Sequence, residues 1–213
     1  MKKLLSIIFF FITIILFLGS SFVNAIEVSV GAGFLKPYIN ITSAGDIFFG
    51  EGSGNEMKEI IGISSVGSTY FLNGNVRLQG IKFMAIELGA NYWSKTEKRT
   101  LPMLDNMNVS TTFRNISFEA NAVFLHRKYA LVPFYGGGVA LHVLNITIKP
   151  EEFPESGEKA TKIKPGIVLF AGLEKQIKHN MKFFVSMRFE NIPGWDQWLL
   201  NANAGIRFNL FCK

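Results

Sequence analysis

Residues 201–213, NANAGIRFNLFCK, decide the fold that we expect for this chain. From Asn201 to Asn209, polar residues or glycine alternate with apolar residues, which is the pattern of a β-strand with one apolar face. A strand at the end of a chain exposes unpaired backbone groups unless another strand pairs with it. We therefore expect the rest of the sequence to form a sheet that this segment completes.

The same alternation recurs along most of the chain. Apolar residues 118, 120, 122 and 124, for example, alternate with residues 117, 119 and 121, which are polar. Phenylalanine (21) and glycine (20) are abundant, which also favours β structure. The pattern predicts an all-β fold with eight strands, at residues 28–36, 69–79, 83–94, 112–125, 131–143, 164–176, 181–191 and 198–211.

The connections between these segments alternate in length. Three are short: GIK, HRKYA and IKHN, at residues 80–82, 126–130 and 177–180. The connections between them are long and polar, such as residues 95–108 and 145–162. Short turns at one end and long loops at the other are typical of membrane barrels. We expect a closed antiparallel eight-stranded transmembrane β-barrel.

The two faces of the predicted strands differ in charge. In nearly every segment, every second residue is apolar, and these residues would face the lipid. Arg114 breaks this pattern, but it lies where the strand should leave the hydrocarbon. The residues between them would face the lumen, which in a barrel of eight strands has room only for side chains. Because an unpaired buried charge is costly, we expect a paired lumen charge network: Arg77, Glu87, Glu119, Glu174, Arg188, Glu190 and Arg207.

Aromatic residues gather near the expected membrane boundaries, as in the aromatic belts of membrane proteins. We expect one belt at the outer strand ends, with Tyr70, Tyr92 and Trp198. The other belt would lie at the inner ends, with Phe124, Phe134, Phe183 and Phe208.

The start of the chain predicts export. Lys2 and Lys3 precede an apolar run at residues 4–18, and Val23-Asn24-Ala25 is a small-residue cleavage site. An uncleaved anchor is the alternative, but the run is shorter than the ~20 residues that span a bilayer. We expect residues 1–25 to be a signal peptide and residues 26–213 to be the barrel. The single cysteine, Cys212, excludes an internal disulfide.

Three stretches resemble the small eight-stranded outer-membrane β-barrels of Gram-negative bacteria, a group that includes the transmembrane domain of outer membrane protein A and porin-like barrels. The stretch IEVSVGAGF (26–34) follows the signal peptide directly, and PFYGGG (133–138) is similar to the group's Pro-Tyr-x-Gly-x-Gly strand. The last segment resembles the C-terminal assembly signal, which implies signal positions at Gly205, Ile206, Phe208, Leu210 and Phe211. In the group the aromatic is usually the last residue, whereas Cys212 and Lys213 follow it here.

The resemblance implies a monomeric outer-membrane protein with both ends in the periplasm. Its partners would be outer-membrane lipid and lipopolysaccharide, and the outer-membrane assembly machinery through the last strand. The formal net charge of +6 comes from scattered residues, which does not indicate nucleic-acid binding. We expect a structural or surface-interaction role with no enzymatic activity, no cofactor and no metal. A narrow channel for small solutes is one alternative.

A lipid A acyltransferase or deacylase is the other alternative, because small barrels of those kinds use a histidine with a serine at the membrane surface. His126 and His179 fall in predicted short turns, where solvated residues are the simpler interpretation. His142 lies near the outer end of its segment, with Thr147 as the nearest hydroxyl in the sequence. A histidine without a base and an orienting partner is a weak catalytic signal.

Overall fold

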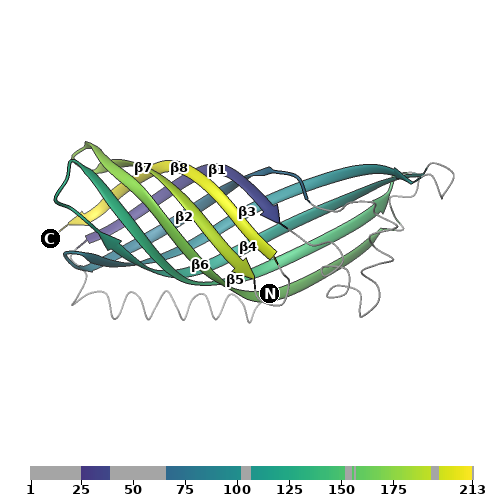
Figure 1. The fold of residues 1–213 in the computed structure, drawn as a ribbon, viewed down its shortest axis with the longest axis horizontal. Helices are drawn as coiled ribbons and strands as arrows, with labels where there is room; N and C mark the ends of the chain where they lie inside the picture. Colours follow the sequence, from purple (N-terminus) through teal and green to yellow (C-terminus); the bar gives the residue numbers. More distant parts are fainter. Residues whose placement is uncertain are drawn as a thin grey trace.

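The computed structural model describes residues 25–38, 66–101, 107–151, 155, 157–192 and 197–212. They form a closed antiparallel barrel of eight strands in sequence order, in which β1 also pairs with β8 (Figure 1). The strands are β1 (Ala25–Tyr38), β2 (Thr69–Ile81), β3 (Met84–Leu101), β4 (Met107–Leu125), β5 (Leu131–Pro150), β6 (Glu158–Lys178), β7 (Met181–Ile192) and β8 (Gln197–Cys212). The expected fold class is confirmed. The predicted signal peptide lies outside the described residues, apart from Ala25.

None of the described residues belongs to a helix long and apolar enough to cross a membrane.

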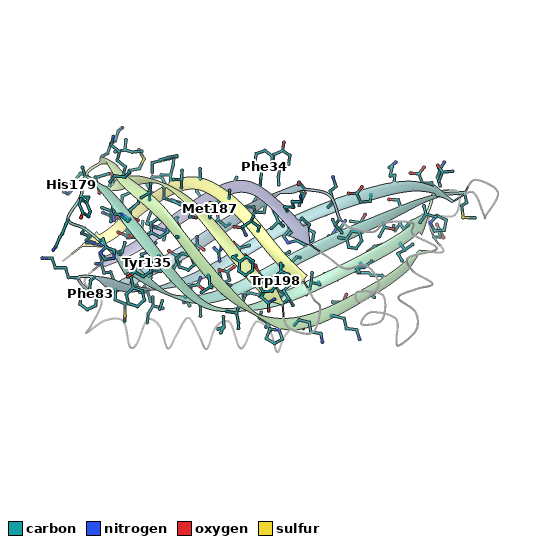
Figure 2. All side chains as sticks on the ribbon, in the orientation of Figure 1. Phe34, Phe83, Tyr135, His179, Met187 and Trp198 are labelled. Atoms are coloured by element: carbon teal, nitrogen blue, oxygen red, sulfur yellow. The ribbon has the colours of Figure 1, made fainter. Side chains whose placement is uncertain are left out.

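The alternation in the sequence becomes an alternation in burial along the central part of every strand. In β4, residues from Val109 to Leu125 are buried at odd positions, whereas the even positions from Arg114 to Phe124 are exposed. Phe34, Met187 and Trp198 point outward from the wall (Figure 2). The outer wall is therefore apolar and the polar parity fills the inside, as a barrel in lipid requires.

Three short turns lie at one end of the barrel, at residues 82–83, 126–130 and 179–180. We call this the turn end and the opposite end the loop end. At the loop end β3, β4, β5 and β6 run on beyond the other strands (Figure 1). They contain 18, 19, 20 and 21 residues, whereas a membrane crossing takes about 9–11.

The expectation that residues 95–108 and 145–162 form long loops was wrong for most of both stretches. Residues 95–101, 107–108, 145–150 and 158–162 are strand. The ladder continues because backbone pairing needs no apolar face, and the threonines of this region favour strands. Thr96 and Thr112, for example, share a hydrogen bond of 2.9 Å on the outer face.

The outer face changes from apolar to polar along one line across these four strands. Tyr92 pairs with Ile116, which pairs with Val143, and all three face outward. One outward position further, the neighbours in register are Ser94, Arg114, Asn145 and Thr161. Arg114 therefore lies at the edge of the apolar band, as expected from its place in the sequence.

One residue assigned to the aromatic belts was misplaced. Phe134 faces the lumen and is 4% exposed, because Pro133 and Tyr135 occupy the outward parity of β5. The other belt residues, Tyr70, Tyr92, Phe124, Phe183, Trp198 and Phe208, are exposed on the outer wall.

Close backbone contact in the wall makes Gly136 a test of the fold. A Cβ atom at Gly136 would lie 2.1 Å from the carbonyl oxygen of Ala122 and 2.7 Å from Phe170. At Gly74 the nearest atom, the carbonyl oxygen of Ser29, would be 3.9 Å away. We expect Gly136→Ala to lower the free energy of unfolding by about 1–3 kcal/mol, and Gly74→Ala to change it by less than about 0.5 kcal/mol.

Urea titration in phospholipid vesicles, read by the gel-mobility difference between folded and unfolded barrels, measures both variants. Equal effects at the two glycines would contradict the wall packing.

Candidate functional site

The lumen near the turn end holds a cluster of six charged residues. It comprises Glu27, Arg77, Glu87, Glu174, Lys182 and Arg207, from six different strands. Glu174 is its centre: its carboxylate lies 3.0 Å from Nη1 of Arg77, 2.5 Å from Nη1 of Arg207 and 3.3 Å from Nζ of Lys182. We call these six residues the lower cluster.

The pairing in the lower cluster follows from strand register. Arg77 and Glu87 are direct partners across β2 and β3, and Nη2 of Arg77 lies 2.9 Å from Oε2 of Glu87. Arg77 also faces Glu27 across β1, at 3.7 Å. Charges brought opposite one another by the ladder need little side-chain rearrangement to pair.

Two aromatic rings pack against the arginines of the lower cluster. The guanidinium carbon of Arg77 lies 5.3 Å from the centre of the Phe134 ring, and that of Arg207 lies 5.0 Å from the centre of the Phe184 ring. Guanidinium groups stack favourably on aromatic faces when both are removed from water. Phe134 thus contributes to the lumen instead of the membrane interface.

A second charged cluster, the upper cluster, lies further along the barrel. Arg188 pairs with Glu119 and lies 3.6 Å from Oε1 of Glu190. Asn121 donates to Glu119 at 3.0 Å, and Asn201 donates to Glu190 at 3.1 Å. Asparagine amides therefore supplement the single arginine, at Glu119 from the same strand, β4, and at Glu190 from the neighbouring strand, β8.

The structure thus places all seven sequence-predicted network residues in the lumen, divided between two clusters. Sequence reasoning missed Glu27 and Lys182. Glu27 lay just before the first predicted strand, and Lys182 stood among apolar residues at the start of its segment. Both could have been found from the alternation of inward and outward residues along β1 and β7, because both side chains face the lumen, where the other charged residues lie.

His142 does not lie at the outer surface, where a lipid-modifying histidine was considered. Its side chain is fully buried in the lumen, with Nδ1 3.2 Å from Nδ2 of Asn115 and Nε2 3.9 Å from Oε2 of Glu190. Ser117 is its direct partner across β4 and β5, a neighbour that the local sequence could not reveal. Ser117 is 1% exposed and accepts a hydrogen bond from Asn91, so both groups belong to the packed interior.

An apolar cluster fills the barrel at the loop end. It consists of Leu35, Val66, Phe71, Trp93, Phe113, Leu144, Ile146, Ile192 and Leu199. These side chains come from β1, β2, β3, β4, β5, β7, β8 and the residues before β2. We call this group the apolar cap.

The predicted assembly-signal residues lie on β8, which closes the barrel. Ile206, Phe208 and Leu210 face outward, and Arg207 between them faces the lumen. Gly205 packs against β1, where a Cβ atom would lie 2.2 Å from the carbonyl oxygen of Val30. Phe211 pairs with Ile26 in the ladder, next to a bulge between Ile26 and Glu27, and its side chain lies outside the described ones.

No group of three or more potential metal ligands occurs among the described residues. Their carboxylates in the lumen are instead occupied by arginine, lysine and asparagine donors.

A closed barrel of eight antiparallel strands, with an apolar outer wall and charges inside, defines the class of small transmembrane β-barrels. Among solved structures, the chain is similar to Neisserial surface protein A, with a TM-score of 0.58 at 11% identity over 87% of this chain and 97% of that one. It is also similar to Ail, the attachment invasion locus protein of Yersinia pestis, solved with the heparin analogue sucrose octasulfate, with a TM-score of 0.54 at 11% identity over 87% and 99%.

A major outer membrane protein from Thermus thermophilus gives a TM-score of 0.53 at 9% identity, over 87% of this chain and all of that one (100%). At these identities the likeness is one of fold. Neither the protein-family models nor the curated proteins compared with the sequence gave a match. The resemblance to small outer-membrane barrels is therefore confirmed for the architecture.

Glu174 offers the sharpest test of the lower cluster. Glu174→Gln leaves Arg77, Arg207 and Lys182 without their shared carboxylate, and we expect it to lower the free energy of unfolding by about 3–5 kcal/mol. The matched control is Glu151→Gln, since Glu151 pairs with Lys98 at 2.7 Å on the exposed surface. That exposed pair should contribute no more than about 1 kcal/mol.

Urea titration in vesicles compares the two variants. A loss at Glu174 no larger than the loss at Glu151 would show that the lower cluster is not a coupled buried network.

Proposed function

We propose that the protein is an integral outer-membrane barrel with a structural or surface-interaction role and a lumen closed by its own side chains. The observation that carries the proposal is the filling of the lumen. The lower cluster, the upper cluster and the apolar cap succeed one another along the barrel. The cavity between the two charged clusters measures about 10 Å³, which is room for a single water molecule.

The outer wall supports the membrane location. Large apolar side chains are exposed on every strand, for example Val30, Leu72, Ile86 and Leu169 at 58%, 60%, 52% and 56%. Such an apolar surface around a whole molecule is unfavourable in water and favourable in lipid. Two of the similar solved structures named above are a surface protein and a major outer membrane protein by name, which supports the same location. In this orientation the turn end faces the periplasm.

The extended ends of β3, β4, β5 and β6 support a role at the cell surface. Their outer face is polar, with hydrogen bonds between Thr100 and Asn108 at 2.7 Å and between Thr161 and Asn145 at 2.6 Å. The described pairing of β3 with β2 ends at Trp93, and that of β6 with β7 ends at Ile167. A polar sheet beyond the membrane gives a partner molecule a firm surface to contact.

Conductance separates this proposal from a channel. We expect the purified barrel to give no steady unitary currents in planar bilayers, because charged and apolar side chains occupy the full length of the lumen. The same sample must first show the gel-mobility shift on boiling that identifies a folded barrel. Reproducible current steps from such a sample would overturn the closed lumen and favour a narrow channel.

Assembly tests the role of the last strand. We propose that the outer-membrane assembly machinery recognises β8, so Phe211→Ala should reduce the folded barrel in the membrane fraction severalfold. Deletion of Cys212 and Lys213 should leave assembly intact. Phe83→Ala, which changes an exposed aromatic in the β2–β3 turn, is the matched control.

Normal assembly of Phe211→Ala together with failure of the deletion variant would contradict this assignment of the signal. Quantitative immunoblots of unboiled membrane fractions measure all three variants.

A further inference from the structure

The turn end carries exposed positive charge that no exposed acidic residue among the described ones offsets. Its cations are Lys82 in the β2–β3 turn, Arg127 and Lys128 in the β4–β5 turn, and Lys175 and Lys178 on β6 beside the β6–β7 turn. We call these five residues the basic collar. The described carboxylates nearest to it, Glu27 and Glu174, are each 2% exposed and are held by the cations of the lower cluster.

The loop end is different, because acidic residues there lie among the lysines. Lys98 pairs with Glu151 at 2.7 Å, and Lys95 lies 3.6 Å from Glu97. Within the described part of the chain, exposed acidic residues therefore occur at the loop end and not at the turn end, whereas exposed cations such as Arg114 and Lys149 occur at the loop end too.

Exposed aromatic residues fix the height of the basic collar relative to the bilayer. Phe83 and Tyr129 are 60% and 64% exposed in two of the turns. Tyr135 stacks on Phe124 with ring centres 5.6 Å apart and on His126 at 5.5 Å, and Phe83, Tyr135 and His179 lie toward the same end in Figure 2. Aromatic residues of this kind sit at the headgroup level of a membrane. The basic collar thus lies at the level of the lipid phosphates.

A pocket at the turn-end mouth of the lumen adjoins the collar. It has a volume of about 270 Å³ and is lined by Arg127, Tyr129, Ala130, Val132, Glu174, Gln176 and Lys182. Arg127 donates a hydrogen bond to Oε1 of Gln79, which orients its guanidinium. A guanidinium has five N–H donors, so most of them remain for a phosphate. Glu174 at this pocket is neutralised by Arg77, Arg207 and Lys182.

We propose that the basic collar binds the phosphate headgroups of anionic phospholipids in the leaflet that surrounds the turn end. This inference rests on the membrane embedding proposed above. Each basic residue close to an anionic membrane surface strengthens binding about fivefold, and added salt weakens the effect. Anionic lipid would therefore collect around the turn end and hold the barrel at a fixed depth and direction.

Lipid retention by the whole folded barrel tests the proposal. The protein is held in non-ionic detergent with equal amounts of phosphatidylglycerol and phosphatidylcholine of the same acyl chains, and native mass spectrometry counts each lipid retained. We expect phosphatidylglycerol to be preferred at least tenfold, and salt to reduce the preference.

Two variants with the same change of charge locate the effect. The turn-end variant combines Lys82→Gln, Arg127→Gln, Lys128→Gln and Lys178→Gln, and should lower the preference at least tenfold. The loop-end variant combines Arg114→Gln, Lys149→Gln, Lys159→Gln and Lys162→Gln, all exposed residues, and should retain the preference. Equal losses in both variants, or no preference in the unaltered protein, would overturn the proposal.

Two further measurements separate other outcomes. If millimolar inorganic phosphate abolishes the preference, the collar binds free phosphate and the lipid proposal fails. Folding in vesicles, read by gel mobility, is measured on the same samples. A chain that does not fold in vesicles refutes the membrane location itself, whereas a folded barrel without lipid preference refutes only the collar.

Discussion

The hydrogen bonds between β1 and β8 are the constraint on which the other features of the barrel depend. They run from the pair Ala25 and Cys212 to the pair Tyr38 and Trp198 and leave neither strand with an open edge. In lipid, every backbone group must be satisfied within the protein, and only closure achieves this for a sheet. Closure also divides the side chains into an outer set in contact with lipid and an inner set in a lumen of fixed, small volume. Charged residues of the inner set must therefore pair with one another.

The ion pairs then contribute more to specificity than to net stability. Removing charges from water costs several kcal/mol per ion, and good pairing roughly offsets that cost. A shift of one residue in any strand pairing, however, would turn that strand's charges into the lipid. Glu174 on β6 joins cations from β2, β7 and β8, so an altered register in any of these strands would leave a buried charge without its partner. The lower cluster thus favours one arrangement of strands over its alternatives.

The sequence predicted what depends on local alternation and missed what depends on neighbours across the sheet. Parity alone identified the seven network residues, because charges confined to every second position of a strand indicate a polar face. Phe134 was assigned to the wrong face for two reasons. Three consecutive glycines after Tyr135 hide the alternation of β5, and an aromatic ring packs well both at a membrane interface and against an arginine. The ends of β3 to β6 were taken for loops because their outer face becomes polar beyond Ser94 and Arg114. The pairing of Ser117 with His142 is a matter of register, which short-range patterns do not contain.

The interior of the barrel is asymmetric along its axis. At the turn end, the pocket beside Arg127 reaches Glu174, and the Lys182 side chain remains 11% exposed, so water contacts the lower cluster. At the loop end the apolar cap leaves Trp93, Phe113 and Leu199 almost fully buried. Polar side chains therefore meet water from one side only, and the cap separates them from the other side. This arrangement hydrates the outermost ions of the lower cluster and lowers their desolvation cost, and it is compatible with the closed lumen proposed above.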